Sequence, residues 1–223
     1  MLVPIEEIPE ARSLGGGGRA RESDALQTVA HWAREYLCNP HPDLGRAGDV
    51  CPWCRPSIDL RLFWLCTIRG ASDAGTWCDP PVLELIDAFH ACAPGEGDST
   101  QFKTILAIFP DLRDCGEIAT VHARLKPSFL DSGLMLGEFF ADCDKPGVRN
   151  RAFRPLRAPL PLLVVREMLE VDIVFLADRP EFVTAYLRKH RDRGRQAISR
   201  LLKHAAGVGF SDGEISNLKR SLG

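Results

Sequence analysis

The chain has 223 residues, of which 45% are hydrophobic and 26% are charged, the balance of a globular protein with room for one sizeable domain. Its formal net charge of −2 provides no overall positive field, which argues against binding to nucleic acid or to an anionic membrane. We expect a cytoplasmic protein with reduced cysteines, because residues 1–18 do not read as a signal peptide and no apolar run approaches the roughly 20 residues that span a bilayer.

The first 22 residues contain Pro4, Pro9 and a run of four glycines, so they predict a flexible leader. Ser23 or Asp24 can then cap a helix whose apolar residues recur at helical spacing as far as Leu37. That helix is expected to end at residues 38–40, because Pro40 disfavours helical geometry in the residue before it.

Further along the chain, short apolar runs predict strands. They are residues 60–68, 102–109, 134–140, 162–165 and 172–175. The segment 141–161 between the third and fourth runs is a long loop, and a loop of that length is more often functional, or a covering flap, than idle.

Helices are predicted to begin near Asp79, Asp114 and Pro180, and a second amphipathic run follows the last of these. The helix after Asp114 carries an apolar stripe that includes His122, with a break expected near Pro127. Together these patterns predict a single α+β domain over residues 23–207, with a mixed or antiparallel sheet packed against about five helices. Residues 208–223 are expected to form a polar tail.

The segment from Cys38 to Cys54 brings together three thiols and one imidazole. Cys38 and His41 form a C-x2-H pair and Cys51 and Cys54 form a C-x2-C pair, a spacing that suits a tetrahedral zinc site. The alternative is that these residues are two buried thiols, a surface histidine and an incidental cysteine.

Cys51-Pro52 can also be interpreted as a haem-ligating thiolate, because aromatic and apolar residues surround it in the sequence. Haem propionates are bound well by arginine, and Arg46, Arg149 and Arg154 are candidates for this role. A redox dithiol at Cys51 and Cys54 is a third interpretation, ranked lower because the motif follows a loop and not a strand.

Two further residues are candidates for acid–base chemistry. His122 lies on an apolar helical stripe, where a core histidine bonded to the backbone is favoured over a distal acid or base. Glu138 and Arg166 lie in otherwise apolar strands and, if buried, each needs a partner. Pairing with each other, lining a pocket or lying on an exposed strand face all remain open.

Four phrases of the sequence resemble an uncharacterised bacterial domain family often found near specialised-metabolism genes. They are residues 41–52, Lys126–Phe129, Gly133–Phe139 and Arg149–Leu156, and together they cover residues 38–178. Membership implies no established activity.

More distantly, the order of features is similar to the YqcI/YcgG superfamily of haem-dependent N-hydroxylases, which act on arginine-type guanidines. This resemblance implies that Cys51 ligates haem and that Arg149 and Asn150 lie in a loop near the pocket. The chain departs from that pattern at Phe140-Ala141, where a His-Pro is expected. Cys54 is also an addition to the pattern.

Our leading hypothesis is an enzyme that binds haem b through Cys51 and oxidises a small amino-acid-like metabolite, with His122 and Glu138 as catalytic residues. The alternative is a zinc-stapled, non-catalytic binding or accessory protein that uses Cys38, His41, Cys51 and Cys54. A small-molecule substrate is the expected partner, nucleic acid and membranes are not, and a homodimer is left open.

Overall fold

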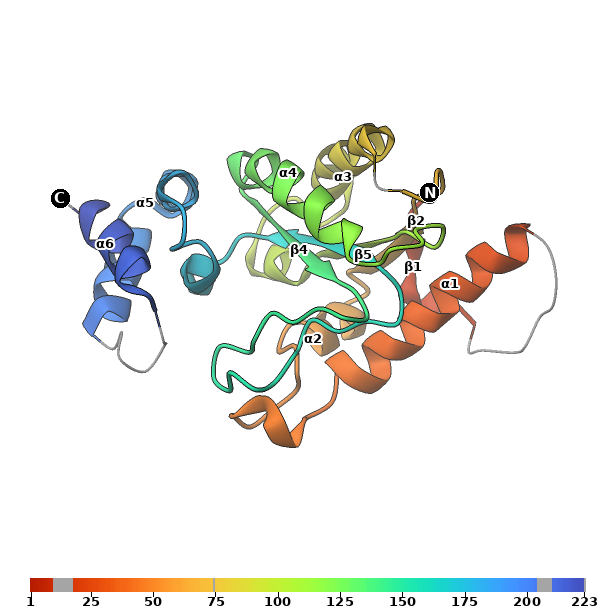
Figure 1. The fold of residues 1–223 in the computed structure, drawn as a ribbon, viewed down its shortest axis with the longest axis horizontal. Helices are drawn as coiled ribbons and strands as arrows, with labels where there is room; N and C mark the ends of the chain where they lie inside the picture. The colour runs from red at the N-terminus through yellow and green to blue at the C-terminus, as the bar shows by residue number, and fades with distance from the viewer. Residues whose placement is uncertain (10–17, 74, 204–209, 223) are drawn as a thin grey trace.

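The computed structural model describes residues 1–9, 18–73, 75–203 and 210–222, and these include one five-stranded sheet of order β1-β2-β3-β5-β4 (Figure 1). β2 and β3 are parallel, whereas the other neighbouring strands are antiparallel. The predicted α+β domain with a mixed sheet is therefore confirmed. The strands are β1 (Val3–Pro4), β2 (Phe63–Thr67), β3 (Thr104–Ile108), β4 (Leu134–Phe139) and β5 (Leu162–Glu167).

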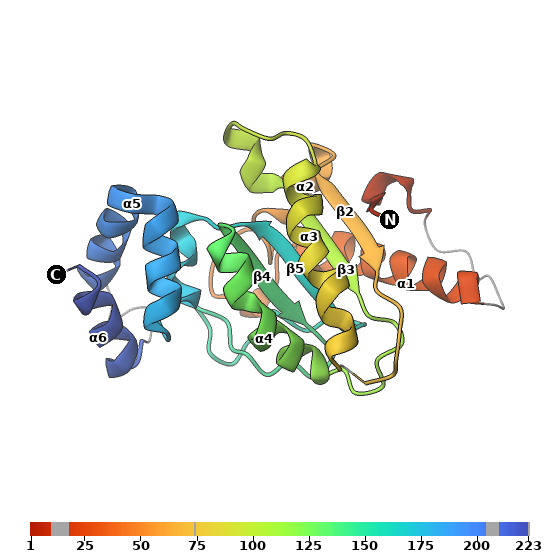
Figure 2. The same cartoon turned by 90° about the horizontal axis from the view of Figure 1, so that it is seen from above.

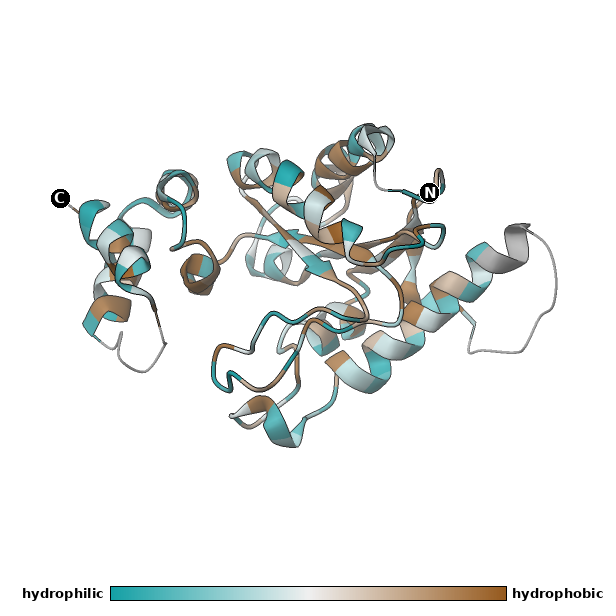
Figure 3. Cartoon of the chain, in the orientation of Figure 1, coloured by the Kyte–Doolittle hydropathy of each residue, from teal (hydrophilic) through white to brown (hydrophobic). Residues whose placement is uncertain are grey.

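The middle of the sheet is its most apolar part. All five residues of β3 are buried, because helices or loops cover both faces of this strand. Figure 3 shows the central strands in the colour of apolar residues, whereas polar residues are concentrated on helix surfaces and loops. A strand buried on both faces needs a continuous apolar run, which is the pattern that residues 102–109 displayed.

Two helices, α3 (Asp79–Ala91) and α4 (Glu117–Asp131), cover one face of the sheet (Figure 2). The predicted stripe of α4, including His122, is buried throughout. The predicted break at Pro127 is wrong, because the helix continues to Asp131. Pro127 and Ala123 are both exposed, so water can bond to the Ala123 carbonyl that loses its helical partner.

The opposite face is covered by α1 (Gly18–Trp32), by the π-helical turn η2 (Ala33–Leu37) that continues it, and by the short helix α2 (Cys54–Asp59) (Figure 1). Helical structure ends at Cys38, as predicted, but α1 begins before Ser23. The predicted strand at 60–68 is confirmed only over Phe63–Thr67, because residues 60–62 bond back to α2 and form the turn that ends it.

The prediction of a flexible leader is wrong for the first residues of the chain. Val3 pairs with Leu65 of β2, and Ile5 is completely buried with Ile8 beside it in the core. An edge strand tolerates proline, so Pro4 does not prevent this pairing. Residues 10–17, which hold most of the glycine run, lie outside the described residues.

The C-terminal part also differs from the prediction. Residues predicted as a strand at 172–175 belong to a 3-10 helix, η6 (Glu170–Phe175), whose turn is fixed by the Asp172 carboxylate accepting from the Leu169 N–H. α5 (Pro180–Lys203), which is broken at Arg191, packs against α4 on one side and against α6 (Asp212–Arg220) on the other (Figure 2).

The expected polar tail is therefore wrong over α6, where Leu218 is fully buried in a core shared with α5. A capping box of Ser211 and Glu214 begins this helix and explains why a largely polar segment is ordered. Residues 204–209 and 223 lie outside the described residues. Within the described part of the chain, no helix combines the length and apolarity needed to cross a membrane.

The burial of Ile5 predicts that the first residues contribute to stability. We expect Ile5→Ala to lower the free energy of unfolding by about 2–4 kcal/mol, since it removes a buried aliphatic side chain. Glu6→Ala, at the exposed neighbouring position, should change the free energy by less than about 0.5 kcal/mol. Urea unfolding of both variants measures this difference, and equal stabilities would show that the first residues do not pack against the sheet.

Candidate functional site

A cavity of about 370 Å³ lies on the face of the sheet that α1 covers and extends around the edge strand β4. This volume is within the range of about 300–1,000 Å³ typical of small-molecule and cofactor sites. Its walls are mainly apolar and include Phe63, Leu106, Met135, Leu136 and Val164. A small number of polar side chains reach the same space, and they come from α4, β4, β5 and two loops.

The cavity brings His122 and Glu138 together. His122 Nδ1 lies 3.1 Å from Glu138 Oε2, and His122 Nε2 lies 2.9 Å from the carbonyl oxygen of Leu136. Glu138 is only 2% exposed. The expectation of a core histidine bonded to the backbone is therefore confirmed, and His122 also contacts a buried carboxylate.

The surroundings of the His122 ring determine what protons the pair can hold. Both ring nitrogens face an oxygen that accepts hydrogen bonds, so Nε2–H donates to Leu136 and Nδ1 faces the carboxylate. A proton between Nδ1 and Oε2 can then belong to either group. Glu138 Oε2 is buried without any well-aligned hydrogen bond, so this proton position is not fixed by another partner.

The third member of this cluster is Lys145, which comes from the long loop and forms an ion pair with Glu138 Oε1. Burial alone would raise the pKa of Glu138, but the neighbouring His122 and Lys145 outweigh it and lower this pKa below its usual value. Glu138 is consequently ionised at neutral pH. Lys126, one turn after His122 on α4, also lines the cavity, and burial lowers its pKa.

The opposite wall contains Cys51, Trp53 and Arg166. Burial raises the pKa of Cys51, although backbone N–H groups of Trp53 and Cys54 and the charge of Arg166 act in the opposite direction. Arg166 donates two hydrogen bonds to Asp172, at 2.7 and 2.5 Å, and its guanidinium lies 5.8 Å from the centre of the Trp53 ring. The suggested pairing of Arg166 with Glu138 is therefore wrong, since each has another partner.

The sequence profile of the family described as "Domain of unknown function (DUF6875)" matches residues 26–200. The chain belongs to this family. All residues that line the DUF6875 cavity, from Leu37 to Asp178, lie inside the matched region. Neither the curated proteins nor the solved structures contain a match to the chain.

The DUF6875 domain does not assemble the four predicted zinc ligands. All four belong to the described residues, and no three His, Cys, Asp or Glu side chains among those residues are grouped to hold a metal ion. Cys51 and Cys54 line the cavity and Cys38 lies next to Cys54. His41 instead packs 4.6 Å from the Phe153 ring and accepts a hydrogen bond from the Asp43 N–H.

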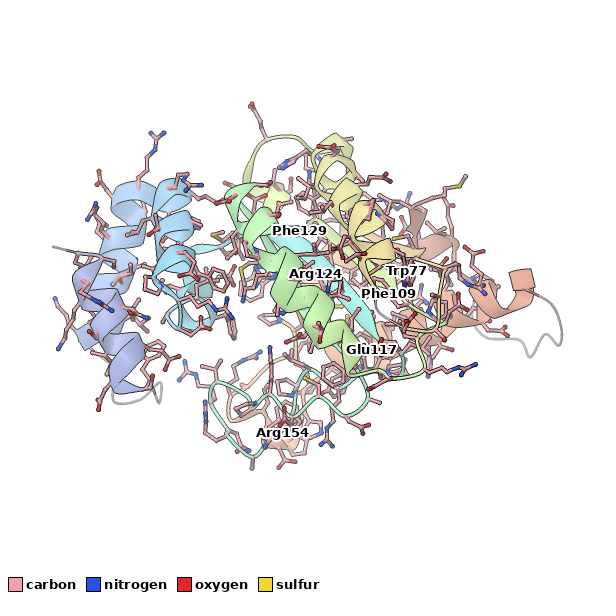
Figure 4. All side chains as sticks on the ribbon, turned by 45° about the horizontal axis from the view of Figure 1, so that its top comes forward. Trp77, Phe109, Glu117, Arg124, Phe129 and Arg154 are labelled. Atoms are coloured by element: carbon pink, nitrogen blue, oxygen red, sulfur yellow. The ribbon has the colours of Figure 1, made fainter. Side chains whose placement is uncertain are left out.

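The arginines predicted to bind haem propionates, Arg46, Arg149 and Arg154, do not line the cavity. Arg46 donates to the carbonyls of Ala47 and Val50, and Arg154 donates to the carbonyl of Arg151. The β-carbon of Arg149 lies close to Gly45. Figure 4 shows Arg154 in the long loop, away from α4. These arginines interact with loop backbone, which is why their number in the sequence was misleading.

The lysines of the cavity were missed. The four-residue spacing of His122 and Lys126 on one helix could have linked these two side chains, since such residues share a face. No comparable signal exists for Lys145, because its position depends on the path of the long loop. That path is fixed at a distance from the cavity, where Asn150 Nδ2 donates to the Asp43 carbonyl at 2.8 Å.

The position of Glu138 predicts a pH-dependent contribution to stability. Its pKa in the folded protein is below the unfolded value of about 4.3, so the ionised form stabilises the fold above that pH, and this contribution is lost as the pH falls through the folded pKa. We expect Glu138→Gln to lower the free energy of unfolding by about 1–3 kcal/mol at pH 7, and by less below about pH 4.

Denaturant unfolding at pH 7 and pH 3.5 measures both effects. Glu84→Gln, on the exposed side of α3, is the matched control and should change the free energy by less than about 0.5 kcal/mol at pH 7. If Glu138→Gln changed the free energy of unfolding by the same amount at both pH values, the result would contradict the expected role of the carboxylate.

Proposed function

We propose that this protein is a haem-dependent oxidative enzyme of the oxygenase or N-hydroxylase type, acting on a small amino-acid-like metabolite in specialised metabolism. The observation that carries the proposal is that Cys51 and the His122–Glu138 pair line one largely apolar cavity. A soft ligand and a buried acid–base pair in one water-poor space are the protein groups that such chemistry requires.

The surroundings of Cys51 fit a thiolate ligand. Backbone N–H groups of Trp53 and Cys54 and the charge of Arg166 lower the pKa of this thiol against the effect of burial. These interactions favour the thiolate, whereas burial favours the neutral thiol, and coordination to a cationic iron would reverse that preference. The thiol does not need to be ionised before the cofactor binds.

The carboxylates of a haem need cations, and the cavity supplies them. Lys126, Lys145 and Arg166 line it, and Arg166 is held rigidly by Asp172. We assign a propionate contact to Lys126, because Arg166 and Lys145 already have carboxylate partners in Asp172 and Glu138. This assignment replaces Arg46, Arg149 and Arg154.

His122 and Glu138 would hold the proton that an oxidation step requires. That proton would be held between Nδ1 and Oε2. Lys145, whose side chain is half-exposed, binds the second carboxylate oxygen. Haem bound in the cavity would supply the activation of dioxygen or peroxide, which no amino-acid side chain provides. The carboxylates of Glu138 and Asp178, together with the lysines, give the cavity both signs of charge, which suits a small zwitterion.

Replacing Cys51 tests the proposed ligand directly. We expect the protein produced with a haem precursor to bind stoichiometric haem. After chemical reduction and addition of carbon monoxide, it should show the red-shifted absorption of a thiolate complex. Cys51→Ser should lose this spectrum because oxygen is a poor substitute for the soft sulfur ligand. Cys66→Ser changes an equally apolar cysteine outside the cavity and should keep it.

Metal analysis of the same samples separates the alternatives. Stoichiometric zinc without a haem spectrum would support the binding or accessory protein and would overturn the enzyme proposal. An unchanged thiolate spectrum in Cys51→Ser would show that another residue ligates haem.

Replacing Lys126 tests the assignment of the propionates. Lys126→Met keeps an unbranched side chain but removes the ammonium group, which lies 5.1 Å from the centre of the Phe182 ring. We therefore expect haem affinity to fall about tenfold, the equivalent of about 1.4 kcal/mol. Lys219→Met makes the same change on the exposed side of α6 and controls for net charge. Haem titration followed by absorbance measures both affinities, and equal affinities would exclude Lys126 from the cofactor contacts.

A further inference from the structure

Cys38 and Cys54 are brought together by the path of the chain between them. Cys38 ends the helical segment that includes η2, and Cys54 begins α2. The Val50 N–H donates to the Asn39 carbonyl and the Cys51 N–H donates to the Leu37 carbonyl, each at 2.9 Å. These bonds close the intervening segment into a loop whose two ends lie side by side.

Both residues also lie at the same carbonyl group. The Cys38 N–H donates to the Ala33 carbonyl at 3.1 Å, and Cys54 Sγ lies 3.8 Å from the same oxygen. The neighbouring Cys54 thiol lowers the pKa of Cys38, and the neighbouring Cys38 thiol raises that of Cys54. The pair therefore consists of two adjacent thiols, one of which can attack an oxidant while the other resolves the product.

The position of the pair determines how a reagent reaches it. Cys38 and Cys54 are 4% and 3% exposed, so large reagents in solution have little access to either sulfur. Cys54 lines the cavity, and Cys38 lies next to it without lining the cavity. A small oxidant that enters the cavity thus meets the Cys54 thiol, and the Cys38 thiol lies next to Cys54.

We propose that Cys38 and Cys54 form a reversible disulfide when a peroxide enters the cavity. Two S–H bonds and the O–O bond break, one S–S bond forms, and hydrogen peroxide is reduced to two water molecules by the two electrons that the thiols lose. The bridge would connect η2 covalently to α2 around Cys51. The inference depends on these two sulfurs and does not require that the protein binds haem.

Peptide mapping of the full-length protein tests the pairing. Hydrogen peroxide is added, catalase removes the excess, free thiols are alkylated, and the protein is cleaved with trypsin. Cleavage after Arg34, Arg46 and Arg61 places Cys38 in one peptide and both Cys51 and Cys54 in the next. A link between these peptides that dithiothreitol removes is the expected product, and fragmentation of the linked peptides identifies Cys54.

Variants distinguish this pair from the C-x2-C motif. Cys51→Ser and Cys66→Ser should keep the link, whereas Cys38→Ser and Cys54→Ser should lose it. The bridged wild type should also melt about 5–10 °C higher than the reduced protein, because a loop of this length restricts the unfolded chain.

Three outcomes would overturn the proposal. They are a bridge between Cys51 and Cys54, oxidation of Cys38 or Cys54 only to sulfinic or sulfonic acid, and full recovery of both thiols after peroxide treatment that oxidises exposed methionine. Because the mapping is read on the wild-type protein, a variant that fails to fold does not affect the result.

Discussion

The carboxylate of Glu138 is the constraint on which the cavity depends. It is 2% exposed on an edge strand, and a buried charge is stable only with partners. Those partners come from distant parts of the sequence, His122 from α4 on one side and Lys145 from the long loop on the other. Satisfying one buried charge therefore fixes the register of a helix and the path of a loop around the β4 edge.

A second buried ion pair organises the opposite wall. Asp172 is fully buried and binds both terminal nitrogens of Arg166, so the guanidinium is held in one orientation against Trp53. The same carboxylate accepts from the Leu169 N–H and fixes the turn that begins η6. The two charge clusters stand on different walls of an apolar space, which lets one wall favour a thiolate while the other holds a proton.

Local patterns in the sequence were sufficient for β3 and α4 but not for the partners of individual side chains. The stripe of α4 and the apolar run of β3 are periodic, so both were predicted with His122 in its buried position. Of the three alternatives left open for Glu138 and Arg166, lining a pocket is the one that the structure supports. The sequence could not exclude their pairing, because it does not place α4 and the long loop beside β4. Residues 3–8 were misjudged because three apolar side chains near a glycine run give no periodic signal. Val3 and Pro4 nevertheless pair with the sheet edge, and Ile5–Glu7 form a 3-10 helix.

The cysteine segment shows why spacing alone misassigned a site. Four potential ligands within a short loop suggest one metal ion, but the backbone bonds from Val50 to Asn39 and from Cys51 to Leu37 direct their side chains differently. Cys54 Sγ and the Cys38 N–H lie at the Ala33 carbonyl, His41 packs on Phe153 of the other loop, and Cys51 remains on the cavity wall. A single ion would need all four side chains to converge, and that would break the contacts that hold the two loops together. The closure of the loop thus keeps His41 away from the cavity, and it leaves Cys51 and Cys54 on the cavity wall.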